Sequence, residues 1–349
     1  MQRRGVQARF EGIGAARMRA AGFRIVFDTR GWSSMGPVDA LTRIVPLLAK
    51  GVATALRLRR DPPDLIVLVD FGAFNLRLAA LLRRLGYVGP ILYYFPPGAW
   101  LDDERRARTV ARRTVALTPF AHQRDFYASL GLPIAYFGHP LMAAVAPPRE
   151  RRPVPAGGAH VALLPGSRRG ELERHVPILL GAFDRIRERR PAAHATFVAA
   201  DAEAETTLRA AAAGRPQIAV RRGTAAALAD ADAAAVASGT AVLEAMLAGV
   251  PSVAFYVVSP AQVKIAERVL RRRIFGGRFV TVPNLVLQRE AIPEYLAWEA
   301  TPEAIGDALE RVLNDPSGQL EAGWDLRRAL GDEESLDRCA AFAIDLLHR

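Results

Sequence analysis

Hydrophobic residues along this chain gather in short unbroken runs, and each run is followed by a longer stretch in which apolar and polar positions mix. Unbroken runs of this length are typical of buried strands, and the mixed stretches are typical of amphipathic helices. In the first part of the chain this pattern predicts strands at 65–70, 91–94, 115–117 and 135–137, with helices at 75–85 and 104–113. Strands that are apolar on both faces indicate a mostly parallel sheet with helices on each side.

A second series of strands and helices follows a segment rich in proline, glycine and charge at 147–158. Its strands are predicted at 161–164, 195–199, 218–220, 233–237 and 252–256. Since the composition of 147–158 is typical of a linker, we predict two domains, residues 1–146 and 159–334, and a last helix at 335–349. The expected fold is α/β, with two doubly wound, Rossmann-like parallel sheets and a ligand in the cleft between them, at the carboxyl ends of the strands.

The segment LLPGSRRGE at 163–171 ends the first strand of the second series. Its apolar run breaks at Pro165, Gly166 and Ser167, a turn that is expected to expose backbone N–H groups. Arg168 follows at once, and its guanidinium group suits a diphosphate. This junction therefore predicts half of a nucleotide-sugar site.

The segment ASGTAVLEAMLAGVP at 237–251 provides the other half. Ser238, Gly239 and Thr240 open a helix whose free N–H groups and positive dipole end attract an anion. Glu244 lies one turn further along and is placed to accept hydrogen bonds from a ribose. Serine and threonine also begin helices as simple caps, so this segment alone has two interpretations. Two such segments at matching strand-to-helix junctions favour the nucleotide-sugar site.

The composition is that of a protein with two ordinary cores, at 349 residues, 50% hydrophobic and 24% charged. Its single cysteine, Cys339, excludes an internal disulfide, and the sequence begins without a basic-plus-apolar signal pattern. No apolar run reaches the roughly 18 residues that span a bilayer. We therefore expect a cytoplasmic protein that is soluble or peripheral to a membrane.

The formal net charge of +11 and the pI near 10.6 favour an anionic partner or surface. Nucleic acid is not expected, because the arginines are scattered and no reader motif or aromatic platform accompanies them. Residues 41–60 mix apolar side chains with arginine and lysine, as in helices that lie on anionic membrane surfaces. Two plainer interpretations stay open: an amphipathic helix packed on the sheet, and an arginine content that reflects codon composition.

Taken in order, these motifs make the chain similar to the lipid-A-disaccharide synthases, glycosyltransferases of the two-domain GT-B type. Further matching segments are EGIGAARMRAAGF at 11–23, SMGPVDAL at 34–41, FNLRLA at 74–79, GHPL at 138–141 and VPNLVLQREAIPEYL at 282–296. The resemblance implies transfer of diacylglucosamine from its UDP-linked form to the 6-hydroxyl of diacylglucosamine 1-phosphate, with inversion and release of UDP. It also implies that the helix at 335–349 packs back on the cleft, and it leaves a homodimer open.

The resemblance further implies roles for individual residues. UDP would be bound by Arg168, Ser238, Gly239, Thr240 and Glu244, and the donor site would be completed by Asn284, Arg289 and Glu290. Ser167 and His139 are further candidates, although His139 is equally well interpreted as a core histidine bonded to backbone. No metal or other cofactor is expected, because arginines and helix termini neutralise the leaving diphosphate and no clustered His, Cys or acidic residues suggest metal ligands.

The amino-terminal half departs from the family at positions that bear on catalysis. Members read Asp-x-Pro-Asp-Phe-Asn, with the second aspartate a candidate general base, where this chain has DFGAFN at 70–75. Ala73 replaces that aspartate, so Asp70 or another carboxylate becomes the candidate base, unless Asp70 only caps the strand end or bonds the next turn. FPPGAW at 95–100 stands where members have Ser-Pro followed by Trp-Ala-Trp.

The beginning of the sequence also differs from the family. Members start with a strand and a Gly-Glu-x-Ser-Gly-Asp loop that helps to form the acceptor side, whereas this sequence starts just before the segment at 11–23. The first strand and helix of the domain are therefore expected to be missing, through a misassigned start or because the chain is truly short. In the second case the sheet would expose an edge.

Three hypotheses for the function remain. The leading one is a lipid glycosyltransferase of the lipid A disaccharide type. The second is a related GT-B enzyme with another acceptor or an epimerase-like reaction, favoured by the altered acceptor side. The third is a non-catalytic paralogue that binds UDP-linked lipid at the membrane surface.

Overall fold

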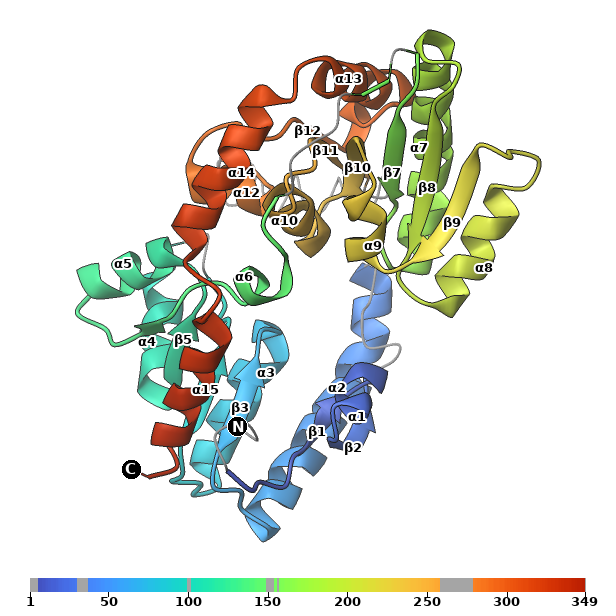
Figure 1. Cartoon of the computed structure of the whole chain (residues 1–349). Helices are drawn as coiled ribbons and strands as arrows, with labels where there is room; N and C mark the ends of the chain where they lie inside the picture. Colours follow the sequence, from blue (N-terminus) through green and yellow to red (C-terminus); the bar gives the residue numbers. More distant parts are fainter. Residues whose placement is uncertain are drawn as a thin grey trace. The chain divides into compact units, whose positions relative to one another are not determined.

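The computed structural model describes residues 6–29, 37–98, 102–148, 154–155, 157–257 and 279–348, with the backbone alone for 37–45. The chain divides into two compact units, which can be followed in Figure 1. The first comprises Met1–Gly138 together with Glu334–Arg349, and the second comprises His139–Glu333. Residues 139–146, which we expected in the first domain, thus group with the second unit. Parts of the segments 34–41, 95–100 and 147–158 lie outside the described residues.

The described strands of the first unit are all parallel and lie in two sheets. β1 (Glu11–Gly14) pairs with β2 (Arg24–Asp28). The second sheet has the order β3 (Ile66–Val69), β4 (Ile91–Tyr94), β5 (Val115–Thr118) and β6 (Ala135–Tyr136). The helices of this unit are α1 (Ala16–Ala20), α2 (Pro37–Arg60), α3 (Gly72–Arg84), α4 (Glu104–Arg113), α5 (Ala121–Ser129) and α15 (Ser335–Asp345).

Helices cover the second sheet of this unit unevenly. Alternate residues of β3 are buried on one face in a core shared with α2 and α3. On the other face, Leu92 of β4 and Leu117 of β5 pack against residues of α15 and the turn after it. Val67 of β3 pairs in register with Leu92 and so shares that face, yet Val67 and Val69 are 49% and 55% exposed. The cover provided by α15 therefore does not reach β3.

The second unit is built on one parallel sheet. Its strand order is β12 (Glu294–Leu296), β11 (Ser252–Tyr256), β10 (Ala233–Ala237), β7 (His160–Leu164), β8 (His194–Ala199) and β9 (Ile218–Arg222). The chain moves outward from β7 through β8 and β9, and then returns to the other side of β7 with β10. The strand order therefore reverses between β7 and β10, the place where open α/β sheets bind ligands at their carboxyl ends.

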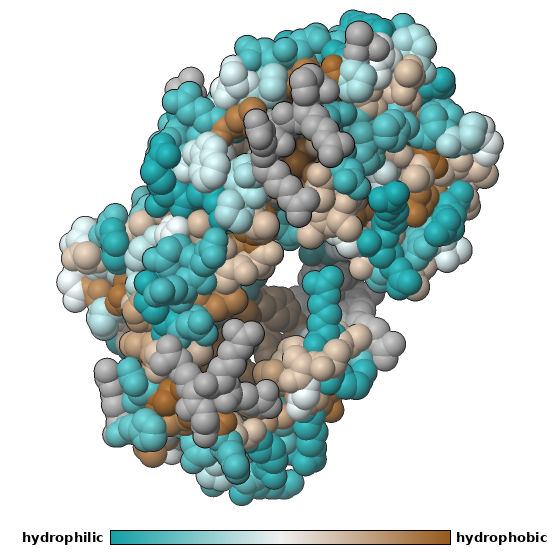
Figure 2. Space-filling view, in the orientation of Figure 1, coloured by the Kyte–Doolittle hydropathy of each residue, from teal (hydrophilic) through white to brown (hydrophobic). Residues whose placement is uncertain are grey.

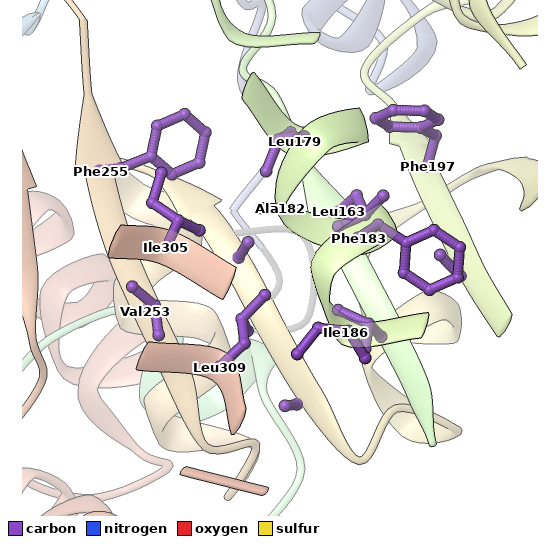
Figure 3. Packing of buried hydrophobic residues seen from close by; sticks show 14 of the residues in the cluster. Leu163, Leu179, Ala182, Phe183, Ile186, Phe197, Val253, Phe255, Ile305 and Leu309 are labelled. Atoms are coloured by element: carbon purple, nitrogen blue, oxygen red, sulfur yellow. The ribbon is translucent and has the colours of Figure 1, made fainter. Parts of the chain in front are cut away.

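The helices described in the second unit are α6 (Leu141–Ala144), α7 (Arg169–Arg189), α8 (Ala202–Ala211), α9 (Thr224–Ala229), α10 (Thr240–Leu247), α12 (Val282–Leu287), η3 (Ala297–Glu299), α13 (Pro302–Asn314) and α14 (Ser317–Leu330). Figure 3 shows Phe183 of α7 and Ile305 of α13 in the buried core over the strands. Gly306 permits the approach of α13 to α7, because a Cβ there would lie 3.0 Å from the carbonyl oxygen of Ala182.

The predicted α/β fold with parallel sheets is confirmed. All nine predicted strands are present within one or two residues, but β1, β2 and the short β12 were not predicted. None of the helices in the described ranges has the length and apolarity needed to cross a membrane. On the face shown in Figure 2, hydrophilic residues cover most of the surface and apolar residues gather in small patches.

Candidate functional site

The loop after β7 is held by a carboxylate from the helix that follows it. Gly166 has a φ of +101°, and Glu171, in the first turn of α7, is 5% exposed. The backbone N–H groups of Ser167 and Arg168 donate to Glu171 Oε2 at 3.0 and 3.2 Å. A Cβ on Gly166 would lie 2.5 Å from the same oxygen, so the loop requires glycine here. The prediction of free N–H groups in this turn is therefore wrong for Ser167 and Arg168.

The Arg168 side chain remains available on the surface. Its Nη1 pairs with Glu171 Oε1 at 2.8 Å, while the side chain is 48% exposed. Burial alone would raise the pKa of the Glu171 carboxyl, but the two backbone donors and Arg168 together lower it. The carboxylate is thus ionised at neutral pH. A guanidinium group has five N–H donors in a planar fork, so pairing with Glu171 leaves others for an anion.

His175 ties the same loop to the end of β11. It is fully buried, and its Nδ1 lies 2.7 Å from the carbonyl oxygen of Pro165. Its Nε2 lies 3.2 Å from the backbone N–H of Val257. Since an N–H must donate to Nε2, Nδ1 carries the proton and donates to Pro165. Burial lowers the pKa of His175, which keeps this neutral form.

The helix that follows β10 begins without a side-chain cap. Ser238 continues the sheet by donating its N–H to the carbonyl oxygen of Phe255 at 2.8 Å. Gly239 is the N-cap of α10 with a φ of +153°, no side-chain cap bond is made there, and Thr240 is exposed. The structure therefore does not support the alternative that Ser238 or Thr240 is only a helix cap. Glu244 lies on the same helix and is partly buried.

The two junctions lie on either side of the reversal in strand order. β7 and β10 are hydrogen-bonded neighbours in parallel, so the loops that follow them leave the same edge of the sheet (Figure 1). Arg168 and the first turn of α10 therefore follow neighbouring strand ends at this edge of the sheet. Paired guanidinium and helix N–H donors at such a place suit a phosphate-bearing ligand.

The residues predicted to complete the donor site divide into two kinds. Asn284 is fully buried, and its Oδ1 accepts the N–H groups of Ala291 and Ile292 at 2.7 and 3.0 Å. Its Nδ2 donates to the carbonyl oxygen of Ile292 at 2.9 Å. Asn284 therefore holds the turn that carries Arg289 and Glu290, which are both exposed. Arg289 forms an ion pair with Asp325 of α14, at 2.6 Å. This ion pair does not connect Arg289 to the loop after β7 or to the start of α10.

His139 is a core residue. It is 4% exposed, its Nδ1 accepts the N–H of Leu141 at 3.2 Å, and its own backbone N–H donates to Leu330. Burial lowers its pKa to about 4, so the ring is neutral at physiological pH. The structure favours the core interpretation of this histidine over a catalytic one.

Asp70 ends β3 in a strained turn of the first unit. Asp70 and Phe71 both have left-handed backbones, with φ of +46° and +42°. The turn is held through the Asp70 carbonyl oxygen, which accepts from Asn75 Nδ2 at 2.7 Å and Tyr93 OH at 2.8 Å. The Asp70 carboxylate is exposed and makes no hydrogen bond or ion pair with any described residue, so it is not a cap. Ala73, the second residue of α3, is also exposed.

Metal ligands are not assembled in the described part of the chain. No group of three or more His, Cys, Asp or Glu side chains comes together there in a way that would hold an ion.

Sequence reasoning did not assign three residues that lie at the junctions, which are Glu171, His175 and Tyr256. The signal for Glu171 was present, since an acid three residues after an N-cap is the pattern of a capping box.

Comparison with known proteins shows the family of this chain. The lipid-A-disaccharide synthetase family matches residues 1–340. The chain belongs to this family. Lipid-A-disaccharide synthases of Myxococcus xanthus and Geobacter metallireducens are 36% and 33% identical to it, over 97% of this chain and 90% and 89% of theirs.

Solved structures of other families share the fold. The calicheamicin glycosyltransferase has a TM-score of 0.55 at 17% identity, covering 99% of this chain and 92% of its own. A UDP-GlcNAc 2-epimerase from Neisseria meningitidis, solved with UDP-GlcNAc, has a TM-score of 0.59 at 8% identity, covering 94% and 87%. The fold is therefore that of the GT-B glycosyltransferases and related epimerases.

Replacing Asn284 by alanine should destabilise the second unit. The change leaves the buried N–H groups of Ala291 and Ile292 without an acceptor, at a cost of about 1–3 kcal/mol for each. Chemical denaturation would measure the free energy of unfolding. Glu290→Ala, an exposed change on the same turn, is the matched control and should stay within about 0.5 kcal/mol. Equal effects of the two changes would contradict a structural clamp at Asn284.

Proposed function

We propose that this chain transfers diacylglucosamine from UDP-diacylglucosamine to the 6-hydroxyl of diacylglucosamine 1-phosphate, inverting the anomeric centre and releasing UDP. The observation that carries the proposal is that Arg168 and the first turn of α10, which has no side-chain cap, follow neighbouring parallel strands at the reversal point of the second sheet. Membership of the lipid-A-disaccharide synthase family supports the choice of donor and acceptor.

The donor half of the reaction needs a group that stabilises the departing diphosphate. The half-exposed Arg168 guanidinium and the N–H groups at the start of α10 supply positive charge without a metal ion. Ser238, Gly239 and Thr240 let the diphosphate approach that helix terminus, and Glu244 accepts hydrogen bonds from the ribose. Arg289 and Glu290, on the turn held by Asn284, complete the donor site.

The acceptor half needs a base. In this proposal Asp70 takes the proton of the 6-hydroxyl while the hydroxyl oxygen forms the new glycosidic bond. The bond between the anomeric carbon and UDP breaks on the opposite side, and UDP leaves with its electron pair. The exposed carboxylate of Asp70 supports this role, because it makes no hydrogen bond or ion pair with any described residue. Ala73 has no group that can accept a proton.

UDP should bind to the folded protein, and Arg168→Ala should weaken the binding about ten- to a hundredfold. Loss of one charge-assisted contact with a diphosphate costs on the order of 1.5–3 kcal/mol. Calorimetric titration would measure both affinities. Arg169→Ala is the matched control, since its side chain is 85% exposed and pairs with Glu173. Absence of UDP binding to folded wild-type protein would exclude the site.

Turnover should depend on Asp70. Asp70→Asn should lower the rate by roughly the 10²–10⁴ that a general base contributes, with UDP affinity unchanged. The assay incubates each form with UDP-diacylglucosamine and diacylglucosamine 1-phosphate and follows UDP and disaccharide by mass spectrometry. Ala73→Asp, tested alongside, restores the carboxylate that family members have at this position.

The outcomes separate the remaining hypotheses. A large gain from Ala73→Asp, with little effect of Asp70→Asn, would show a synthase that has lost its base. No disaccharide from any form, despite tight UDP binding, would favour another acceptor, an epimerase-like reaction or a binding role. The altered residues at 70–75 are the specific observation that keeps these alternatives in view.

We further propose that the protein works at the inner face of the cytoplasmic membrane, with α2 against anionic lipid. Leu48, Val52 and Leu56 lie along one side of α2 and are 42–50% exposed, and Arg59 and Arg60 follow at its end. The opposite side packs in the core, where Gly51 meets the ring of Phe74. The core-packing interpretation therefore describes one face of this helix and leaves the other for lipid.

Binding to vesicles should require both anionic lipid and low salt. The protein should sediment with anionic vesicles at low ionic strength and be released as salt rises, because the attraction to headgroups is screened. Leu48→Ser combined with Val52→Ser should reduce the sedimented fraction without changing UDP affinity. Equal recovery in the supernatant with anionic and neutral vesicles would return α2 to a purely structural role.

A further inference from the structure

Glu171 makes three contacts with the loop after β7, although its side chain is almost completely buried. Its Oε2 accepts the backbone N–H groups of Ser167 and Arg168, and its Oε1 pairs with the Arg168 guanidinium at 2.8 Å. The hydroxyl of Tyr256, at the end of β11, lies 3.4 Å from Oε1. One carboxylate thus fixes both the backbone and the side chain of Arg168.

His175 fixes the loop from its other side. It follows Glu171 by one helical turn on α7 and donates to the carbonyl oxygen of Pro165, while Val257 donates to its second nitrogen. Glu171 therefore holds the N–H groups of the loop and His175 holds a carbonyl group. Both side chains are buried and both reach the end of β11, so the loop is anchored to two strands at once.

We infer that Glu171 is a positioning residue for Arg168, which orients the guanidinium before the nucleotide arrives. This inference rests on the proposed UDP site. A long side chain that is free in solution must be ordered when it contacts a ligand, and that ordering lowers affinity. The ion pair with Glu171 orders Arg168 in advance, while its half-exposed guanidinium keeps donors for the diphosphate.

A double-mutant cycle measured by UDP titration tests the inference. Glu171→Gln keeps the size of the side chain and an acceptor for the loop but removes the charge that holds Arg168. It should weaken UDP binding about three- to tenfold, the size expected for ordering one long side chain. In an Arg168→Ala background the same change should have no further effect, because Glu171 acts through Arg168. A merely structural role would weaken binding in both backgrounds.

A second variant keeps the charge of the carboxylate but shortens the side chain that carries it. Glu171→Asp withdraws the carboxylate from the Arg168 guanidinium, so it should also weaken binding only when Arg168 is present. Glu173→Gln is the control, since Glu173 is exposed on the same helix and pairs with Arg169. Tighter binding by Glu171→Gln, or equal losses in both backgrounds, would overturn the inference. Failure of the wild type to bind UDP would instead overturn the proposed function.

Discussion

The second unit depends on the burial of β7 and β10 from both faces. Every residue of these two strands is buried, and β10 consists of alanine and valine alone. Strands buried on both faces cannot face water, so they pair in the centre of the sheet and helices close over each side. Small side chains on β10 also let the helices approach closely. The carboxyl ends of the two strands are thereby fixed as neighbours.

The chemistry of the site follows from which hydrogen-bond donors each junction offers to a ligand. After β10, glycine begins a helix without a side-chain cap, so no capping side chain takes up the N–H groups at the positive end of α10. After β7, the corresponding backbone donors are already occupied by Glu171, and the positive charge is offered by Arg168 instead. The two junctions look alike in sequence but present an anion with different groups, one from backbone and one from a side chain.

Sequence reasoning located the strands and both junctions because those signals are local. A run of apolar residues followed by glycine and serine is visible without knowing its partners. It did not find that Glu171 fills the turn, or that Asn284 is a buried clamp, because these facts depend on how a side chain folds back or meets Ala291 and Ile292. The link from His175 to Val257 joins residues far apart in the chain, and no local pattern indicates it. β12 was not predicted, because a strand of three residues is too short to show a pattern of apolar and polar positions.

The position of α15 has a consequence for biosynthesis. The second unit is one continuous stretch of chain, whereas the first is completed only when α15 covers Leu92 and Leu117. Domains usually fold in the order in which the ribosome releases them. Here the unit made first must wait with an apolar face uncovered until the last helix emerges, while the unit made second can already close. During synthesis, the amino-terminal unit therefore exposes apolar strand residues to solvent until α15 has been made.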